Sequence, residues 1–175
     1  MAKTVGRLKE VLRKIDFLGL KVILTFSDLP GCHFYTKDDK KLAFWSSAAV
    51  RERVIEFWGT LVDHIVELKG CIAGYDLINE PFSEVDETVG DLDEPTMDGS
   101  DILNEFYQAA IKRIRKSDPD TIIILKPLHW GSPLSMFTLK PVEDCHVAYG
   151  IHMYGPTDIT QTLELHPFRL SLIHI

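Results

Sequence analysis

The stretch Gly74-Tyr75-Asp76-Leu77-Ile78-Asn79-Glu80-Pro81 decides the fold that we expect for this chain. It closes an apolar run from Cys71 to Ile78, which begins directly after Gly70. A run of this length suits a strand that is buried on both faces, as strands of parallel sheets are. Asn79 and Glu80 then have two interpretations. They begin a solvated loop, or they place a carboxylic acid at the tip of a barrel strand for proton transfer.

Helical and strand patterns alternate along the rest of the chain. Apolar residues recur at helical spacing over residues 5–18, 47–68 and 103–114, and apolar strand-like runs cover 22–26, 121–125 and 146–151. Gly19 and Gly70 stand where helices are expected to end, and Ser46 or Ser47 can cap the second helix. One domain built from β/α repeats is therefore predicted.

Composition narrows the class of protein. The chain has 175 residues, 45% of them hydrophobic and 26% charged, which is enough for one sizeable core. Its formal net charge of −7 argues against nucleic acid or an anionic membrane as a partner. No run is apolar and long enough to cross a bilayer, and no signal peptide opens the chain. We expect no cofactor, and the oligomeric state stays open.

Two groups of residues suggest metal or disulfide chemistry, and neither pattern supports it. Cys32, Cys71 and Cys145 are scattered and odd in number, so we expect three buried apolar side chains. The acidic residues between 84 and 101 lack the glycine and closing glutamate of a calcium-binding EF-hand loop. We expect that segment to be a long exposed loop over the strand tips, without a metal.

Polar and aromatic residues gather directly after each predicted strand. They are Ser27 and Asp28, Asn79 and Glu80, His129 and Trp130, and His152 and Tyr154. Apolar parallel strands with chemistry at their C-terminal ends are typical of a (β/α) barrel or a doubly wound sheet. No glycine-rich phosphate loop follows any strand, which favours the barrel. Trp130 is either a stacking platform for a sugar ring or a lid on the core, whereas Trp45 and Trp58 are expected to be structural.

These motifs resemble glycoside hydrolase family 5, the cellulase family. The resemblance rests on residues 18–31, Trp45-Ser46, the block from Gly74 to Pro81, and His152-Met153-Tyr154-Gly155-Pro156. It implies a (β/α)8 TIM barrel that hydrolyses O-glycosidic bonds in β-linked polysaccharides with retention of configuration, and a secreted, extracellular protein.

The resemblance also implies roles for particular residues. Glu80 matches the general acid/base, and Asn79 matches the residue that hydrogen-bonds the sugar beside the scissile bond. His152 and Tyr154 match an active-site pair at the sixth strand. Ser27 stands where the family usually has histidine, and we expect it to face substrate.

By the same resemblance the chain covers the third to sixth strands, an incomplete barrel of about four strands. The active-site arginine, the nucleophilic glutamate and a sugar-stacking tryptophan of the family have no counterpart here. Residues 170–175 match the translation of a transposon end used in preparing sequencing libraries. We therefore expect a partial catalytic domain over 1–169 and a non-native tail over 170–175.

Two functions follow from these expectations. The first is a β-glycan hydrolase of the cellulase or glucanase type, of which this chain alone is inactive because Glu80 lacks its partner carboxylate. The alternative is a non-catalytic carbohydrate-binding relative, which stays open because Ser27 and Thr25 stand where the resemblance implies histidine and aspartate.

Overall fold

A four-stranded parallel sheet forms the centre of the computed structural model, which describes residues 2–26, 43–82 and 97–153. The strands are β1 (Val22–Thr25), β2 (Ile72–Asp76), β3 (Ile122–Leu125) and β4 (Val147–Tyr149), and they lie in the order β1-β2-β3-β4. Every pair of neighbours is parallel. The C-terminal ends of all four strands therefore meet at one edge.

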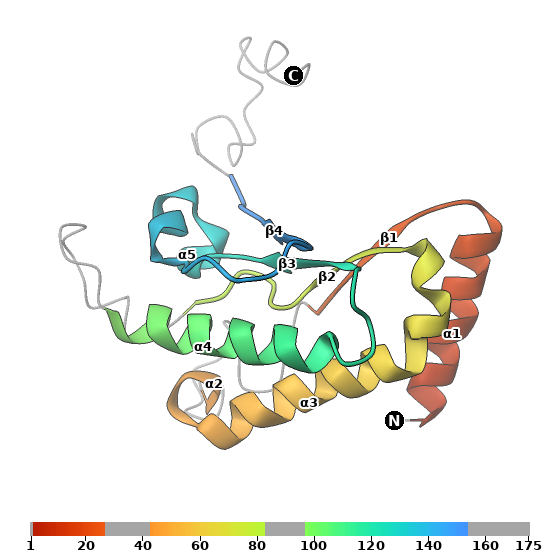
Figure 1. Cartoon of the computed structure of the whole chain (residues 1–175), viewed down its shortest axis with the longest axis horizontal. Helices are drawn as coiled ribbons and strands as arrows, with labels where there is room; N and C mark the ends of the chain where they lie inside the picture. The colour runs from red at the N-terminus through yellow and green to blue at the C-terminus, as the bar shows by residue number, and fades with distance from the viewer. Residues whose placement is uncertain (1, 27–42, 83–96, 154–175) are drawn as a thin grey trace, which may run out of the picture.

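The long helices gather on one side of this sheet (Figure 1). The long helices are α1 (Ala2–Phe17), α3 (Ala48–Ile65) and α4 (Met97–Ile114), and the short ones are α2 (Ala43–Ser46), η2 (Val66–Cys71), α5 (Leu128–Gly131) and η4 (Pro133–Thr138). Sequential strand order with the long helices on one side is the arrangement of a barrel segment, whereas a doubly wound sheet reverses its order and is covered on both faces.

The core lies between the sheet and the helices. Trp58 of α3 is fully buried, and its indole Nε1 donates a hydrogen bond of 3.1 Å to the carbonyl of Leu77. Its ring packs edge-on against Phe26 and Tyr75. Trp45 is buried against Phe44. The structural roles predicted for Trp45 and Trp58 are confirmed.

The structure corrects two of the predicted helix boundaries. The second helix does not run to Gly70: α3 ends at Ile65, and the tighter 3₁₀ turn η2 follows, which lets the Cys71 thiol reach the Leu12 carbonyl of α1. The acidic segment is not all loop, because α4 already begins at Met97. Its earlier part, residues 84–96, lies outside the described residues.

The prediction of three buried cysteines is wrong for one of them. Cys71 is buried as expected, but Cys145 is exposed in the loop before β4, and Cys32 lies outside the described residues. Ser47 occupies the N-cap of α3 as predicted, although its side chain makes no capping hydrogen bond.

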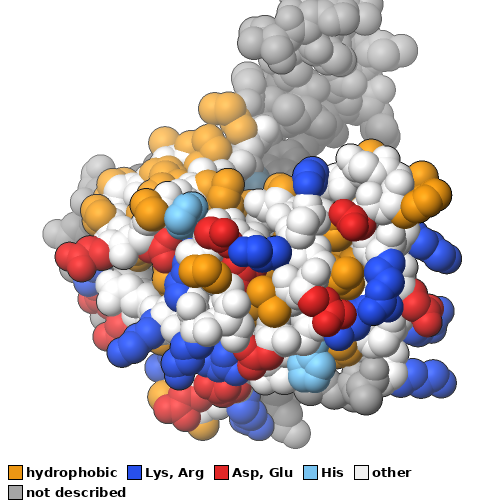
Figure 2. Space-filling model, turned by 45° about the vertical axis from the view of Figure 1, so that its right-hand side comes forward, with side chains coloured by type: hydrophobic (Ala, Val, Ile, Leu, Met, Phe, Trp, Pro, Cys, Tyr) orange, Lys and Arg blue, Asp and Glu red, His pale blue; other side chains and the backbone are white. Residues whose placement is uncertain are grey.

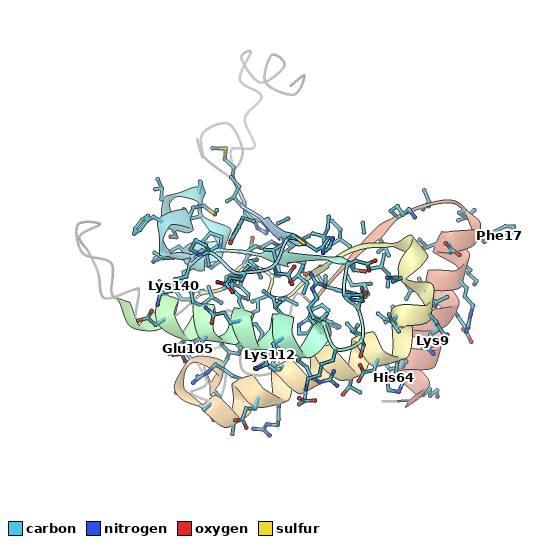
Figure 3. The ribbon with its side chains drawn as sticks, viewed as in Figure 1. Lys9, Phe17, His64, Glu105, Lys112 and Lys140 are labelled. Atoms are coloured by element: carbon cyan, nitrogen blue, oxygen red, sulfur yellow. The ribbon has the colours of Figure 1, made fainter. Side chains whose placement is uncertain are left out.

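Apolar side chains remain exposed near the β1 edge of the sheet. Phe17 at the end of α1 is 90% exposed and projects away from the body of the molecule (Figure 3). Leu18, Leu20 and Ile23 are also more than half exposed. Apolar surface that gathers in one place marks a region that packs against another part of a protein or a partner.

Charged side chains of both signs intermingle over the face shown in Figure 2. Among the described residues, no helix is long and apolar enough to span a membrane. No three His, Cys, Asp or Glu side chains in these same ranges are grouped as a metal site would require.

Candidate active site

Three loops meet at the C-terminal edge of the sheet and are tied together by backbone hydrogen bonds. The amide of Trp130, after β3, donates to the carbonyl of Pro81, after β2, at 3.2 Å. The amide of His152, after β4, donates to the carbonyl of Gly131 at 2.9 Å. The loops that follow three neighbouring strands therefore form one connected unit.

Glu80 and His152 face each other within this unit. A hydrogen bond of 2.8 Å joins Oε1 of Glu80 to Nδ1 of His152. The two side chains are 22% and 23% exposed, so a substrate can reach them while protein still surrounds most of each. Nδ1 donates in this bond whenever Glu80 is ionised, because a carboxylate can only accept.

The backbone around these residues is strained. Glu80, His129 and Trp130 have φ angles of 48°, 55° and 58°, and they are the only non-glycine residues with positive φ in the described part of the chain. A left-handed conformation costs about 1–3 kcal/mol for a residue with a side chain, and such strain gathers at functional sites. All three strained residues belong to the loops that carry Glu80 and Trp130.

Trp130 lies at the surface of the site. Its ring is 48% exposed and stacks on Phe82, with ring centroids 4.5 Å apart and an angle of 18° between the planes. The two interpretations of Trp130, a stacking platform and a lid on the core, both remain predictions, since the ring is half exposed and packs on the buried Phe82. A half-exposed indole supported from behind by a second ring is a suitable platform for a sugar ring.

Two charged residues beside Asn79 were missed by the sequence analysis. Nζ of Lys126 lies 2.6 Å from Oδ2 of Asp76 and 3.4 Å from Oδ1 of Asn79. Both charged side chains are buried. A signal for them existed, since Asp76 and Lys126 interrupt or end apolar strands, and a buried charge requires a partner.

The structure does not place two of the predicted site residues. Ser27 and Tyr154 lie outside the described residues. His129, to which no role was assigned, shares a hydrogen bond of 2.7 Å between its Nδ1 and the hydroxyl of Ser135. Glu80, Asn79, His152 and Trp130 are thus the four predicted site residues that the structure brings to one edge.

This fold, with its polar residues at the C-terminal edge of parallel strands, is that of a (β/α)-barrel segment, and the comparison with known families agrees. The chain belongs to glycosyl hydrolase family 5: residues 2–170 match the cellulase family. The resemblance inferred from the sequence is confirmed, and so is the expected fold, an α/β barrel segment whose sheet is not closed within the described residues. Among the curated proteins compared with it, none matches the chain.

Solved structures show the same fold at low sequence identity. A hyperthermophilic endo-β-1,4-glucanase in complex with substrate is 20% identical, with a TM-score of 0.70, over 91% of this chain and 44% of that one. Thermotoga maritima Cel5A in complex with mannotriose is 20% identical, with a TM-score of 0.69, over 97% and 48%. Pseudomonas stutzeri endoglucanase Cel5A is 25% identical, with a TM-score of 0.60, over 84% and 40%. The chain therefore spans less than half the length of each of these proteins.

Proposed function

We propose that this chain carries the acid/base half of a retaining glycoside hydrolase that cuts β-linked polysaccharides of the glucan type. The observation that carries the proposal is the Glu80 carboxyl at the C-terminal edge of the sheet, hydrogen-bonded to His152. Support comes from the cellulase family match and from a structural neighbour described as an endo-β-1,4-glucanase.

In the proposed reaction Glu80 acts twice. Its carboxylic acid first gives a proton to the glycosidic oxygen, while a second carboxylate attacks the anomeric carbon and the sugar–oxygen bond breaks. As a carboxylate, Glu80 then takes a proton from the water that displaces the sugar from the enzyme. His152 holds the Glu80 side chain in place by the 2.8 Å hydrogen bond.

The second carboxylate has to lie about 5–5.5 Å from Glu80. We propose that it comes from sequence beyond this chain, which also completes the barrel and packs on the apolar surface around Phe17. Support comes from the solved structures, because this chain covers less than half of the length of each of them. The full-length enzyme, by which we mean the product of the whole reading frame, is then the active form, and we expect it to be secreted.

For substrate binding we propose the residues around Glu80. Trp130 stacks on a sugar ring, and Asn79 and His152 bind beside the scissile bond. Ser27 and Tyr154 complete this set on the basis of the family motif alone. The non-catalytic alternative is not favoured, because Glu80 has retained a positioned hydrogen-bond partner.

The test is Glu80→Gln in the full-length enzyme. Turnover of β-1,4-glucan should fall steeply with folding intact, whereas aryl glycosides with good leaving groups should lose less in the first step, since they need less protonation. Azide should partly restore turnover by attacking the glycosyl-enzyme without a general base. Glu105→Gln on the exposed face of α4 (Figure 3) is the matched control. Equal turnover by the Glu80→Gln variant and the wild type on glucan would remove Glu80 from the mechanism.

A further inference from the structure

We propose that Lys126 is a positioning residue, which fixes the orientation of the Asn79 amide toward the glycan, and that Asp76 holds Lys126 in place. The inference rests on the proposed function, because it assigns to Asn79 a contact with the sugar. Lys126 lies outside the stretches on which the family resemblance was based, and Asp76, although it lies within the block from Gly74 to Pro81, was given no role by that resemblance.

The pair is buried at the end of two neighbouring strands. Asp76 is the last residue of β2, and Lys126 directly follows β3. Their side chains are 7% and 8% exposed, and Nζ lies 2.6 Å from Oδ2. Desolvating two charges costs about as much as their attraction returns, so a pair of apolar side chains would be as stable here. Stability alone therefore does not account for the pair.

The second contact of Lys126 gives the pair a role. An ammonium group has three donors and no acceptor, so the Asn79 atom that faces it at 3.4 Å must be the carbonyl oxygen. The amide NH₂ of Asn79 then points away from Lys126. An asparagine side chain without this contact can present either its oxygen or its nitrogen to a ligand, and Lys126 removes that ambiguity.

Lys126 is itself held on several sides. The hydroxyl of Tyr107 accepts from the Lys126 amide at 3.2 Å and donates to its carbonyl at 2.8 Å. The aliphatic stem passes over Gly150, where an added Cβ would lie 3.4 Å from Cγ and 3.5 Å from Cε of the lysine. The other oxygen of Asp76, Oδ1, is buried and has no hydrogen-bond partner among the described residues. Removing Lys126 would therefore leave that carboxylate without its donor.

Two variants of the full-length enzyme separate the positioning role of Lys126 from its effect on the stability of the fold. Lys126→Met should be destabilised, since Asp76 is left as an unpaired buried charge. The apolar-pair variant, Lys126→Met with Asp76→Leu, should regain thermal stability. Its kcat/KM on β-1,4-glucan should nevertheless be about five- to tenfold below wild type, the effect of one hydrogen bond. Lys140→Met, which removes an exposed lysine paired with Asp101 (Figure 3), is the matched control.

A double-mutant cycle with Asn79→Ala then tests whether Lys126 affects kcat/KM through Asn79. In the Asn79→Ala background the apolar pair should cause no further loss of kcat/KM. Losses that multiply, or an apolar-pair variant with wild-type kcat/KM, would overturn the proposal. Crystal structures of the apolar-pair variant should show the Asn79 amide turned or in two orientations, and an unchanged amide would also overturn it. If the wild type turns over no β-glycan, the proposed function fails, while the Asn79 orientation still decides the role of Lys126.

Discussion

Nδ1 of His152 and Oε1 of Glu80 lie 2.8 Å apart, although 72 positions of sequence separate the two residues. One follows β4 and the other follows β2, so the contact reaches across the loop that follows the strand between them. That middle loop takes part as well, because the Gly131 carbonyl accepts from the His152 amide. The position of the histidine ring therefore depends on all three loops.

Removing the His152 ring is expected to reduce activity more than stability. His152→Ala should lower kcat/KM on glucan about tenfold to a hundredfold, as expected for loss of one hydrogen bond to a charged group. Its thermal unfolding should change little, since the side chain is partly exposed. His64→Ala, on the exposed face of α3 (Figure 3), is the control and should leave both unchanged. Equal losses in the two variants would contradict the pairing of His152 with Glu80.

Trp130 should report ligand binding by its fluorescence. Of the three tryptophans in this chain, Trp45 and Trp58 are buried and Trp130 is half exposed. Acrylamide should therefore quench Trp130, and a β-1,4-linked oligosaccharide stacked on the ring should protect it. The comparison with Trp130→Phe isolates its signal. Protection that persists in Trp130→Phe would place the stacking elsewhere.

Two glycines with positive φ allow backbone strain to be separated from effects on the site. Gly19, after α1, has a φ of 69° and open space around it, and Gly131 has a φ of 76° and would bring a Cβ to 3.5 Å from Cγ of His152. Alanine at either position should cost about 1–2 kcal/mol of unfolding free energy, measured by urea titration. Only Gly131→Ala should also lower kcat/KM, because it touches His152. Equal losses of kcat/KM in the two variants would show that the contact between position 131 and His152 does not affect the site.

Asp118 is expected to be a main source of stability away from the site. Its buried carboxylate accepts hydrogen bonds from the Tyr75 hydroxyl at 2.8 Å and from the Thr121 hydroxyl at 2.7 Å. Burial alone would raise the pKa of Asp118, but these hydrogen bonds outweigh it and the pKa lies below its usual value. Asp118→Asn should cost roughly 2–3 kcal/mol at pH 7, because an amide replaces one acceptor by a donor. Asp120→Asn, an exposed neighbour, should cost under about 0.5 kcal/mol.

The Asp118 carboxyl also makes the stability of the fold depend on pH. A carboxyl whose pKa is lowered in the folded state contributes stability above its unfolded pKa, about 3.9 for aspartate. This contribution is lost as the pH falls through the lower folded value. Urea unfolding at pH 7 and at pH 3 should therefore show a smaller difference between wild type and Asp118→Asn at pH 3. A difference that stays constant would mean that Asp118 is not responsible.

The sequence predicted the strands and the site positions that depend on local pattern. Apolar runs ending on polar residues located β1 to β4, and in a parallel sheet such ends necessarily share an edge, which brought Glu80 and His152 together. The charge pair of Asp76 and Lys126 was not predicted. Which side chains meet across strands depends on the register, and the register follows from the packing of the whole sheet.

The backbone conformation of the site residues could not be predicted from the sequence pattern either. Nothing in Glu80 or Trp130 favours positive φ, since residues with side chains other than Asn and Asp rarely adopt it. Hydrogen bonds between loops, such as the one from the Trp130 amide to the Pro81 carbonyl, hold these residues there. The change from α3 to the 3₁₀ turn at Val66 has a similar origin, in contacts with α1.

The order of the strands in the sheet has a consequence for how the protein is made. Parallel strands cannot be joined by a tight turn, and the segment between Val22 of β1 and its partner Ile72 of β2 contains α2 and α3. β2 can therefore pair with β1 only after these helices have been synthesised. Because the spatial order of β1 to β4 is also their order of synthesis, β3 and β4 each join the free edge of a sheet that already exists. These four strands can thus assemble in the order of translation, without breaking any pairing between them that formed earlier.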